Sequence, residues 1–159
     1  MRGDGIQHRM PTQREITVAP DRFELAADDA VMVTELRSAI AVCLYDAVEE
    51  AGALLHLRCI VRTPKPVDVT DSTLATELLL LDRCVESMRE LAPSARNLQA
   101  RVVAHLPDLP QARETFDTVL TMVQHFLADA DVRVLPLDIA SGNARSLRFR
   151  PCMGWLQTR

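Results

Sequence analysis

The chain contains four cysteines and four histidines, and a cysteine paired with a histidine can carry out nucleophilic catalysis in hydrolases. His56 and Cys59 are the closest such pair in the sequence, but residues three apart on a strand lie on opposite faces, so we do not expect them to meet. Cys43 lies within an apolar run and is interpreted as a core residue. The cysteines have no C-x-x-C pairing and no ligand spacing with the histidines, which favours reduced thiols and predicts no metal site.

Residues 33–56, VTELRSAIAVCLYDAVEEAGALLH, place a histidine downstream of a long apolar run. They resemble the active-site segment of the chemoreceptor glutamine deamidases, the CheD family, whose members carry T-x-G-L-G-S-C-V-A-V-C-L-Y-D followed by a histidine. The positions that match this pattern without a gap are Leu36, Ser38, Ala41, Val42, Cys43, Leu44, Tyr45, Asp46, Gly52 and His56. In that family the cysteine is the nucleophile, the histidine accepts and returns the proton, and an upstream threonine orients the imidazole. The corresponding positions here are Ala39, His56 and Val33.

The resemblance implies a scaffold whose reaction chemistry has been removed. Ala39 has no nucleophilic atom, and in other hydrolases the loss of a nucleophile lowers turnover by about a millionfold. Val33 cannot hydrogen-bond to an imidazole. Thr34 is adjacent, but a one-residue slip along a strand turns a side chain to the other face, so we count the orienting hydroxyl as lost. Arg37 replaces a glycine and is expected to reshape or block the pocket.

The resemblance extends more weakly over about residues 15–157. The family's Lys-x-Phe-Gly-Gly-Ala segment corresponds to residues 105–108, where the glycines are absent. Its Asp-x-Gly-Gly-x-x-Gly-Arg segment corresponds to residues 138–145, which keep Asp138 and Arg145 but lack three glycines. Positions that build the fold are therefore retained, whereas positions that would approach a substrate are replaced.

The residues that remain at this site are interpreted as a docking surface and not as a reaction centre. The candidates comprise the retained histidine, the position of the lost nucleophile and four binding residues. They are His56, Ala39, Arg37, Ser38, Thr34 and Arg145.

Short segments rich in Val, Ile, Ala and Leu predict β-strands, and prolines and charged turns separate them. The predicted strands cover residues 31–35, 38–45, 53–61, 97–106 and 132–139, with a hairpin over 147–157. Pro136 lies inside the strand predicted over 132–139, which suits the edge of a sheet. Residues 62–71 contain two prolines and predict a surface loop.

Two helices are predicted from apolar residues that recur at three- and four-residue steps. The first is capped by Asp71 or Ser72 and closed by Pro93, and the second begins at Pro110 and runs to about Ala128. The predicted buried faces are Leu74, Leu78, Leu81, Val85 and Met88 in the first helix, and Ala112, Phe116, Val119, Val123 and Phe126 in the second.

The order of these elements predicts an α+β fold of layered mixed β-sheets with two helices packed against sheet. The resemblance to the CheD family implies two packed mixed sheets with both helices on one side. A chain of 159 residues with 48% hydrophobic content can bury one core, so we expect a tail over 1–14 and a single domain over 15–159.

Charge and hydropathy narrow the possible partners. The net charge is −4 and the basic residues are scattered, so a nucleic-acid partner is not expected. The N-terminal segment has no apolar core of a secretory signal, and no window approaches the roughly 18 apolar residues of a membrane span. We therefore expect a cytoplasmic protein without membrane insertion, and no cofactor.

The resemblance implies a CheD-like chemotaxis protein that has lost its activity and acts by binding methyl-accepting chemotaxis receptors or a CheC-type phosphatase. The alternative is an active chemoreceptor deamidase that converts receptor Gln to Glu through another nearby group, and a third hypothesis is a fold repurposed outside chemotaxis. Because Arg37 and Val33 also differ from the family, Ala39→Cys alone is not expected to restore activity.

Overall fold

The computed structural model describes residues 13–59 and 72–159. The part of the predicted tail up to residue 12, the predicted loop over 62–71 and the cap that Asp71 would provide lie outside these ranges.

Two mixed sheets form the centre of the molecule. The strands of the six-stranded sheet are β2 (Arg22–Ala26), β5 (Ala51–Arg58), β4 (Ala39–Asp46), β6 (Gln99–His105) and β7 (Arg133–Val134), with β8 (Asp138–Ala140) also paired to β6. The strands of the four-stranded sheet, in spatial order, are β1 (Glu15–Thr17), β3 (Val31–Leu36), β9 (Arg145–Arg150) and β10 (Trp155–Thr158). Each sheet contains a parallel pair as well as antiparallel pairs.

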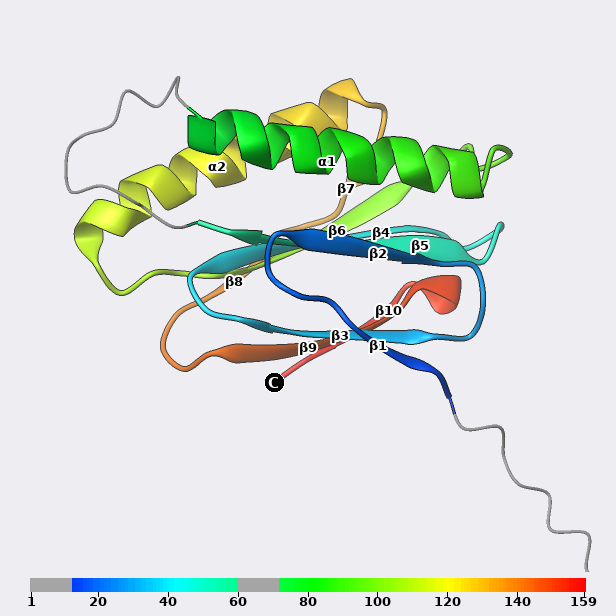
Figure 1. Cartoon of the computed structure of the whole chain (residues 1–159), viewed down its shortest axis with the longest axis horizontal. Helices are drawn as coiled ribbons and strands as arrows, with labels where there is room; N and C mark the ends of the chain where they lie inside the picture. The colour runs from blue at the N-terminus through cyan, green and yellow to red at the C-terminus, as the bar shows by residue number, and fades with distance from the viewer. Residues whose placement is uncertain (1–12, 60–71) are drawn as a thin grey trace, which may run out of the picture.

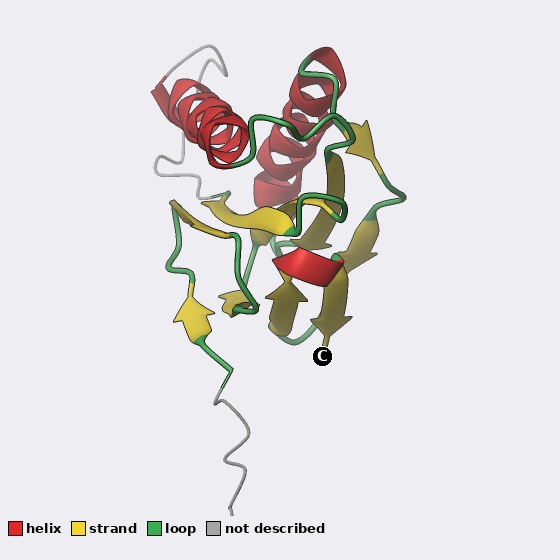
Figure 2. Cartoon of the chain, turned by 90° about the vertical axis from the view of Figure 1, so that its right-hand side faces the viewer, coloured by secondary structure: helices red, strands yellow, loops and turns green. Residues whose placement is uncertain are grey.

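The helices α1 (Ser72–Leu91) and α2 (Pro110–Asp129) cover one face of the six-stranded sheet, and the four-stranded sheet covers the other (Figure 1). The view from the side shows both helices above the two sheets (Figure 2). The predicted α+β fold of layered mixed sheets with two helices on one side is therefore confirmed. No helix among the described residues is long and apolar enough to cross a membrane.

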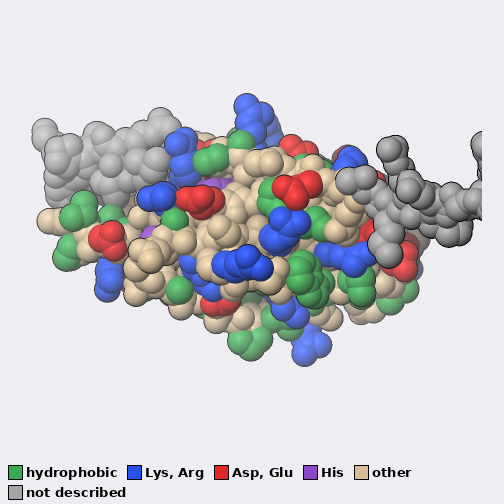
Figure 3. All heavy atoms as spheres, turned by 90° about the horizontal axis from the view of Figure 1, so that it is seen from below, with side chains coloured by type: hydrophobic (Ala, Val, Ile, Leu, Met, Phe, Trp, Pro, Cys, Tyr) green, Lys and Arg blue, Asp and Glu red, His purple; other side chains and the backbone are tan. Residues whose placement is uncertain are grey.

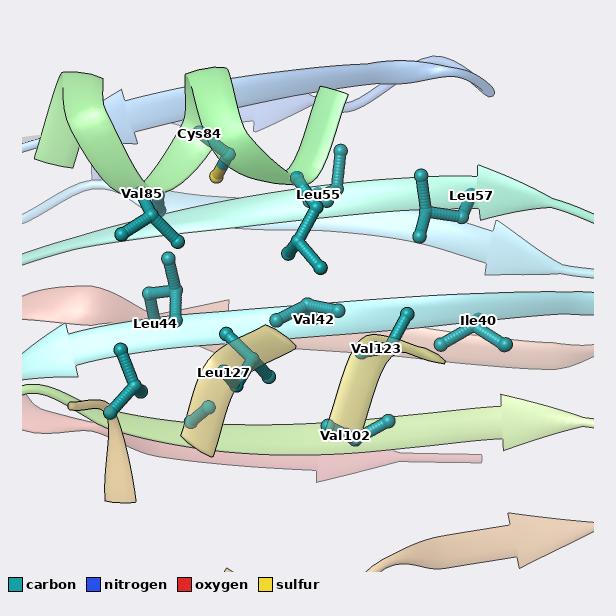
Figure 4. Packing of buried hydrophobic residues seen from close by; sticks show 14 of the residues in the cluster. Ile40, Val42, Leu44, Leu55, Leu57, Cys84, Val85, Val102, Val123 and Leu127 are labelled. Carbon is teal, nitrogen blue, oxygen red and sulfur yellow. The ribbon is translucent and has the colours of Figure 1, made fainter. Parts of the chain in front are cut away.

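Strand β4 is buried along its whole length because it lies in the middle layer. A strand covered on both faces reads as a continuous apolar run, which is the pattern of AIAVCLYD. Ile40, Val42 and Leu44 face the helices and pack with residues such as Val85 and Val123 (Figure 4). The alternate residues of β4 face the four-stranded sheet and form a second core, whose buried members include Ala39, Ala41, Cys43, Tyr45, Met32, Leu36, Leu147 and Phe149.

The two helices were predicted closely, but one position of the first buried face was wrong. Leu81, Val85 and Met88 are buried in α1, whereas Leu78 is 39% exposed. In α2 the most deeply buried residue near the end is Leu127, with the predicted Phe126 only partly buried.

The strand prediction was incomplete in two places. Strands β1 and β2 were missed because they are short and carry exposed charged residues between partly buried ones. The single strand predicted over 132–139 is two short strands, β7 and β8, both parallel to β6. Pro136 lies between them, and it cannot donate a ladder hydrogen bond. The terminal hairpin is present, with a 3-10 turn at Pro151–Met153 between β9 and β10.

Candidate functional site

The candidate site lies where the chain passes from one sheet to the other. Strand β3 ends at Leu36 in the four-stranded sheet, Arg37 and Ser38 form the turn, and β4 begins at Ala39 in the six-stranded sheet. Ala39 is fully buried, and its direct neighbours are Arg58 on β5 and His105 on β6.

His56 lies on β5 beside this position. It pairs with Ala41 on β4, so it is the diagonal neighbour of Ala39, and it is only 2% exposed. Diagonal neighbours in an antiparallel pair are roughly 7–8 Å apart, which is within reach of a long side chain. A side chain at position 39 and the His56 imidazole would therefore share one space between the sheets.

Thr34 orients the His56 ring. The Thr34 hydroxyl lies 2.7 Å from His56 Nδ1 and donates its own proton to the backbone oxygen of Val18 at 2.8 Å. Because that proton is used, the hydroxyl oxygen accepts the Nδ1 proton of the imidazole. The Nε2 atom then carries the lone pair, as in a histidine ready to accept a proton.

The prediction that the orienting hydroxyl is lost was therefore wrong. Thr34 faces the space between the sheets, and Val33 faces the outer surface of the four-stranded sheet. The error arises at Ser38, whose φ of 47° places it in the left-handed region. Side-chain alternation does not run through such a turn, so the faces of β3 are set by its pairing with β9, where Thr34 is opposite Leu147.

His56 is held in its neutral form. Burial lowers the pKa of His56, the nearby Asp21 carboxylate opposes this shift, and the Arg58 guanidinium adds to it. Asp21 also fixes the end of β5: its carboxylate accepts hydrogen bonds from the Arg58 backbone at 3.0 Å and from the Arg58 side chain at 2.9 Å. Its N–H donates to the His56 carbonyl at 2.8 Å. Sequence reasoning missed Asp21, because only the pairing of β2 with β5 brings it here.

Cys43 is the other diagonal neighbour of His56 on β4, but it is fully buried, and none of the four cysteines is an accessible thiolate at His56. Cys43, Cys59 and Cys84 are buried free thiols, and burial raises the pKa of each, that of Cys84 to about 12. Cys59 lies in the core on the helix side, opposite to His56, as predicted, and Cys43 is a core residue, as predicted. Cys152 lies near the start of β10, where burial and the neighbouring Asp29 raise its pKa.

The side chain of Arg37 extends into solvent. It is 78% exposed, and its Nε lies 3.1 Å from a carboxylate oxygen of Glu35. The expected blocking of a pocket by this arginine is therefore not what the structure shows. Ser38 turns inward instead, since its N–H donates to His105 Nδ1 at 2.9 Å.

Arg145 is occupied by contacts within the fold. Its guanidinium donates to the Asp138 carboxylate at 3.0 Å, to Thr158 Oγ1 at 3.1 Å and to the backbone oxygens of Asp138 and Ala104. The side chain is only 12% exposed. These contacts hold β6, β8 and β10 together and favour a structural role over the predicted binding role.

The site is closed to solvent at its centre. Ala39 and His56 are buried, and neither residue lines either of two hollows on the described surface. One lies on the outer face of the four-stranded sheet, between residues such as Val33 and Arg148, where arginine side chains cross the surface (Figure 3). Within residues 13–59 and 72–159, no group of three His, Cys, Asp or Glu side chains could hold a metal ion.

No protein-family model matches the chain, and no curated protein matches it. The fold and the site define an α+β domain with a buried, oriented histidine beside an alanine.

Proposed function

We propose that this protein is a catalytically inactive relative of the chemoreceptor glutamine deamidases that acts in the cytoplasm by binding chemotaxis proteins. The partners are methyl-accepting chemotaxis receptors or a CheC-type phosphatase. The observation that supports this best is the hydrogen bond between Thr34 and His56, which fixes the tautomer of a buried histidine next to the position that Ala39 occupies. The His56 imidazole can accept a proton, but the alanine at position 39 has no thiol or hydroxyl from which to take it.

The other groups near His56 do not replace the missing thiol. The Thr34 hydroxyl uses its proton on Val18, and this is the hydroxyl that contacts the imidazole among the described residues. Ser38 adjoins Ala39, but its hydrogen bonds to His105 and to Cys59 are made through the backbone. An active deamidase is therefore the weaker hypothesis.

Because the centre of the site is closed, the docking surface is the turn above it. Arg37 is the exposed charged residue of that turn, and it is restrained by an ion pair with Glu35 that water can screen. An arginine can form two parallel hydrogen bonds to a carboxylate and is common among the residues that dominate protein interfaces. We expect Arg37 to contact the partner directly.

The test is a binding titration of the purified protein with a receptor cytoplasmic fragment and, separately, with a CheC-type phosphatase. Arg37→Glu should weaken binding at least about tenfold, because it reverses the charge at the proposed contact. Arg83→Glu is the matched control, since Arg83 is exposed on α1 in the helical layer, outside the proposed contact, and should leave affinity unchanged. Failure of the wild-type protein to bind either partner would remove the proposal.

Catalysis is tested by mass spectrometry of the receptor after incubation with the protein. We expect no conversion of Gln to Glu. Conversion by the wild-type protein would establish the alternative, and its loss in Ser38→Ala would assign the nucleophile. Ala39→Cys alone is still expected to be inactive, but for a different reason: Thr34 and Arg37 are no obstacle, whereas position 39 is fully buried.

A further inference from the structure

His105 is a buried histidine that the proposed function does not use. It is 5% exposed, lies on β6 directly beside Ala39, and makes hydrogen bonds with both ring nitrogens. Nδ1 accepts the Ser38 N–H at 2.9 Å, and Nε2 lies 2.8 Å from the carbonyl oxygen of Gly142. The two partners come from different segments, the turn before β4 and the loop between β8 and β9.

These two contacts fit one protonation state. An amide N–H requires an acceptor at Nδ1, and a carbonyl oxygen requires an N–H at Nε2, so the ring is neutral with its proton on Nε2. A protonated imidazole carries a proton on both nitrogens. The Nδ1 proton would then face the N–H of Ser38, and two donors cannot form a hydrogen bond.

The Ser38 contact restrains an unfavourable backbone conformation. Ser38 has a φ of 47°, a region that side chains with a Cβ seldom adopt, and it directly precedes Ala39. Its N–H is held by His105, and its carbonyl oxygen accepts from the Cys59 N–H at 3.3 Å. Gly142, with a φ of 94°, needs no such restraint. Loss of the His105 contact therefore affects the turn more than the loop.

Two ion pairs lie near His105, Arg58 with Asp21 and Arg145 with Asp138. The titratable and charged groups of the turn and of the neighbouring strands include Arg37 in the turn, His56 and Arg58 on β5, Arg101 on β6, Asp138 on β8, and Arg145, Arg148 and Arg150 on β9. Of these, only Asp138 is negative, and its carboxylate is engaged with Arg145. A positive charge on His105 would find no unpaired carboxylate among them.

We propose that His105 is a pH-sensitive latch that, while neutral, holds the Arg37–Ser38 turn in its left-handed conformation beside position 39. Protonation breaks the hydrogen bond from Ser38 and releases the turn that directly precedes Ala39. The latch concerns how this chain holds its own site, so it goes beyond the proposed function and stands or falls without a binding partner.

The test is amide hydrogen exchange, followed by NMR between pH 8 and pH 5, the range in which histidines change charge. Protection of the Ser38 amide, corrected for intrinsic exchange, should fall at least about tenfold over this range. The amide of Val42, in the middle of β4, serves as the internal reference and should stay protected. Equal protection of Ser38 at both pH values would refute the latch, and so would parallel loss at Val42, which indicates global unfolding.

Two variants separate the nitrogens. In His105→Asn the side-chain oxygen can accept from Ser38 near the Nδ1 position but does not titrate, so Ser38 should stay protected at both pH values. In His105→Gln the side chain can donate to Gly142 but has no acceptor near Nδ1, so Ser38 should be unprotected at both. His125→Asn, at an exposed position of α2, is the control and should titrate like the wild type. The wild-type titration needs no variant, so a variant that fails to fold leaves the proposal testable.

Discussion

Replacement of Thr34 by valine should destabilise the protein by disconnecting the two sheets at His56. The Thr34 hydroxyl, on the four-stranded sheet, contacts Nδ1 of His56 on the six-stranded sheet at 2.7 Å and the carbonyl oxygen of Val18 at 2.8 Å. Thr34 is 8% exposed, so water cannot easily take the place of the hydroxyl. Valine has nearly the same volume, which confines the effect to the lost hydrogen bonds.

The magnitude follows from the groups left without a partner. A buried donor or acceptor without a partner costs about 1–3 kcal/mol, and Thr34→Val leaves one of each, so the expected loss of unfolding free energy is roughly 2–6 kcal/mol. For a protein of this length, that corresponds to a fall in Tm of roughly 4–24 °C. Thr34→Ser keeps the hydroxyl and loses one methyl group, which should cost only about 0.5–1.5 kcal/mol.

The assay is denaturant unfolding at pH 7.5, a pH at which His56 is neutral, with Val33→Thr as a second control. Val33 faces the outer surface of the sheet, so a hydroxyl there should change stability by less than about 0.5 kcal/mol. The reasoning is refuted if Thr34→Val unfolds within about 1 kcal/mol of the wild type, or if Thr34→Ser is destabilised as much as Thr34→Val.

Three further substitutions test other parts of the site. Because burial lowers the pKa of His56, the stabilising contribution of the neutral imidazole is complete above about pH 6.5 and is lost as the pH falls. The urea midpoint of His56→Asn should therefore decline less between pH 7 and pH 5.5 than that of the wild type. Parallel curves for the two proteins would contradict this. Arg145→Met removes a network of hydrogen bonds and should lower the unfolding free energy by about 3 kcal/mol or more, whereas Arg148→Met loses a half-exposed ion pair and should lower it by less than about 1 kcal/mol. Equal shifts in Tm for the two variants would count against a structural role for Arg145. Ser38→Gly relieves a left-handed residue and should raise stability by up to about 1 kcal/mol, while Ser146→Gly in β9 should lower it by about 0.5–1 kcal/mol; a loss at both positions in urea unfolding would exclude strain at the turn.

The layers were predictable from sequence because burial leaves a periodic pattern. Strands β4 and β6 read as apolar runs, and α2 shows its buried stripe, from Phe116 to Leu127. Strands β1 and β2 leave no such pattern. They lie at sheet edges and are held by pairing with β3 and β5, which are distant in sequence, so their local residues do not identify them.

The site was predicted in part for the same reason. His56 and Ala39 belong to neighbouring antiparallel strands, so a count of residues is enough to relate them. Thr34 is separated from both by the turn at Ser38, where the left-handed backbone interrupts the alternation of side chains, so a count of residues does not predict the face on which Thr34 lies. His105 contacts Gly142, which lies in the loop between β8 and β9, and no local pattern in the sequence predicts this contact.

The four-stranded sheet has a consequence for the order in which the molecule can assemble during synthesis. Strand β3 is made early, but its partner β9 comes after both helices and the whole six-stranded sheet. A growing chain can therefore complete the helical layer while Thr34 still lacks its neighbouring strand. Contacts between segments far apart in sequence form late, since they close the longest loops. We therefore expect His56 to become enclosed only late in folding, when β9 pairs with β3.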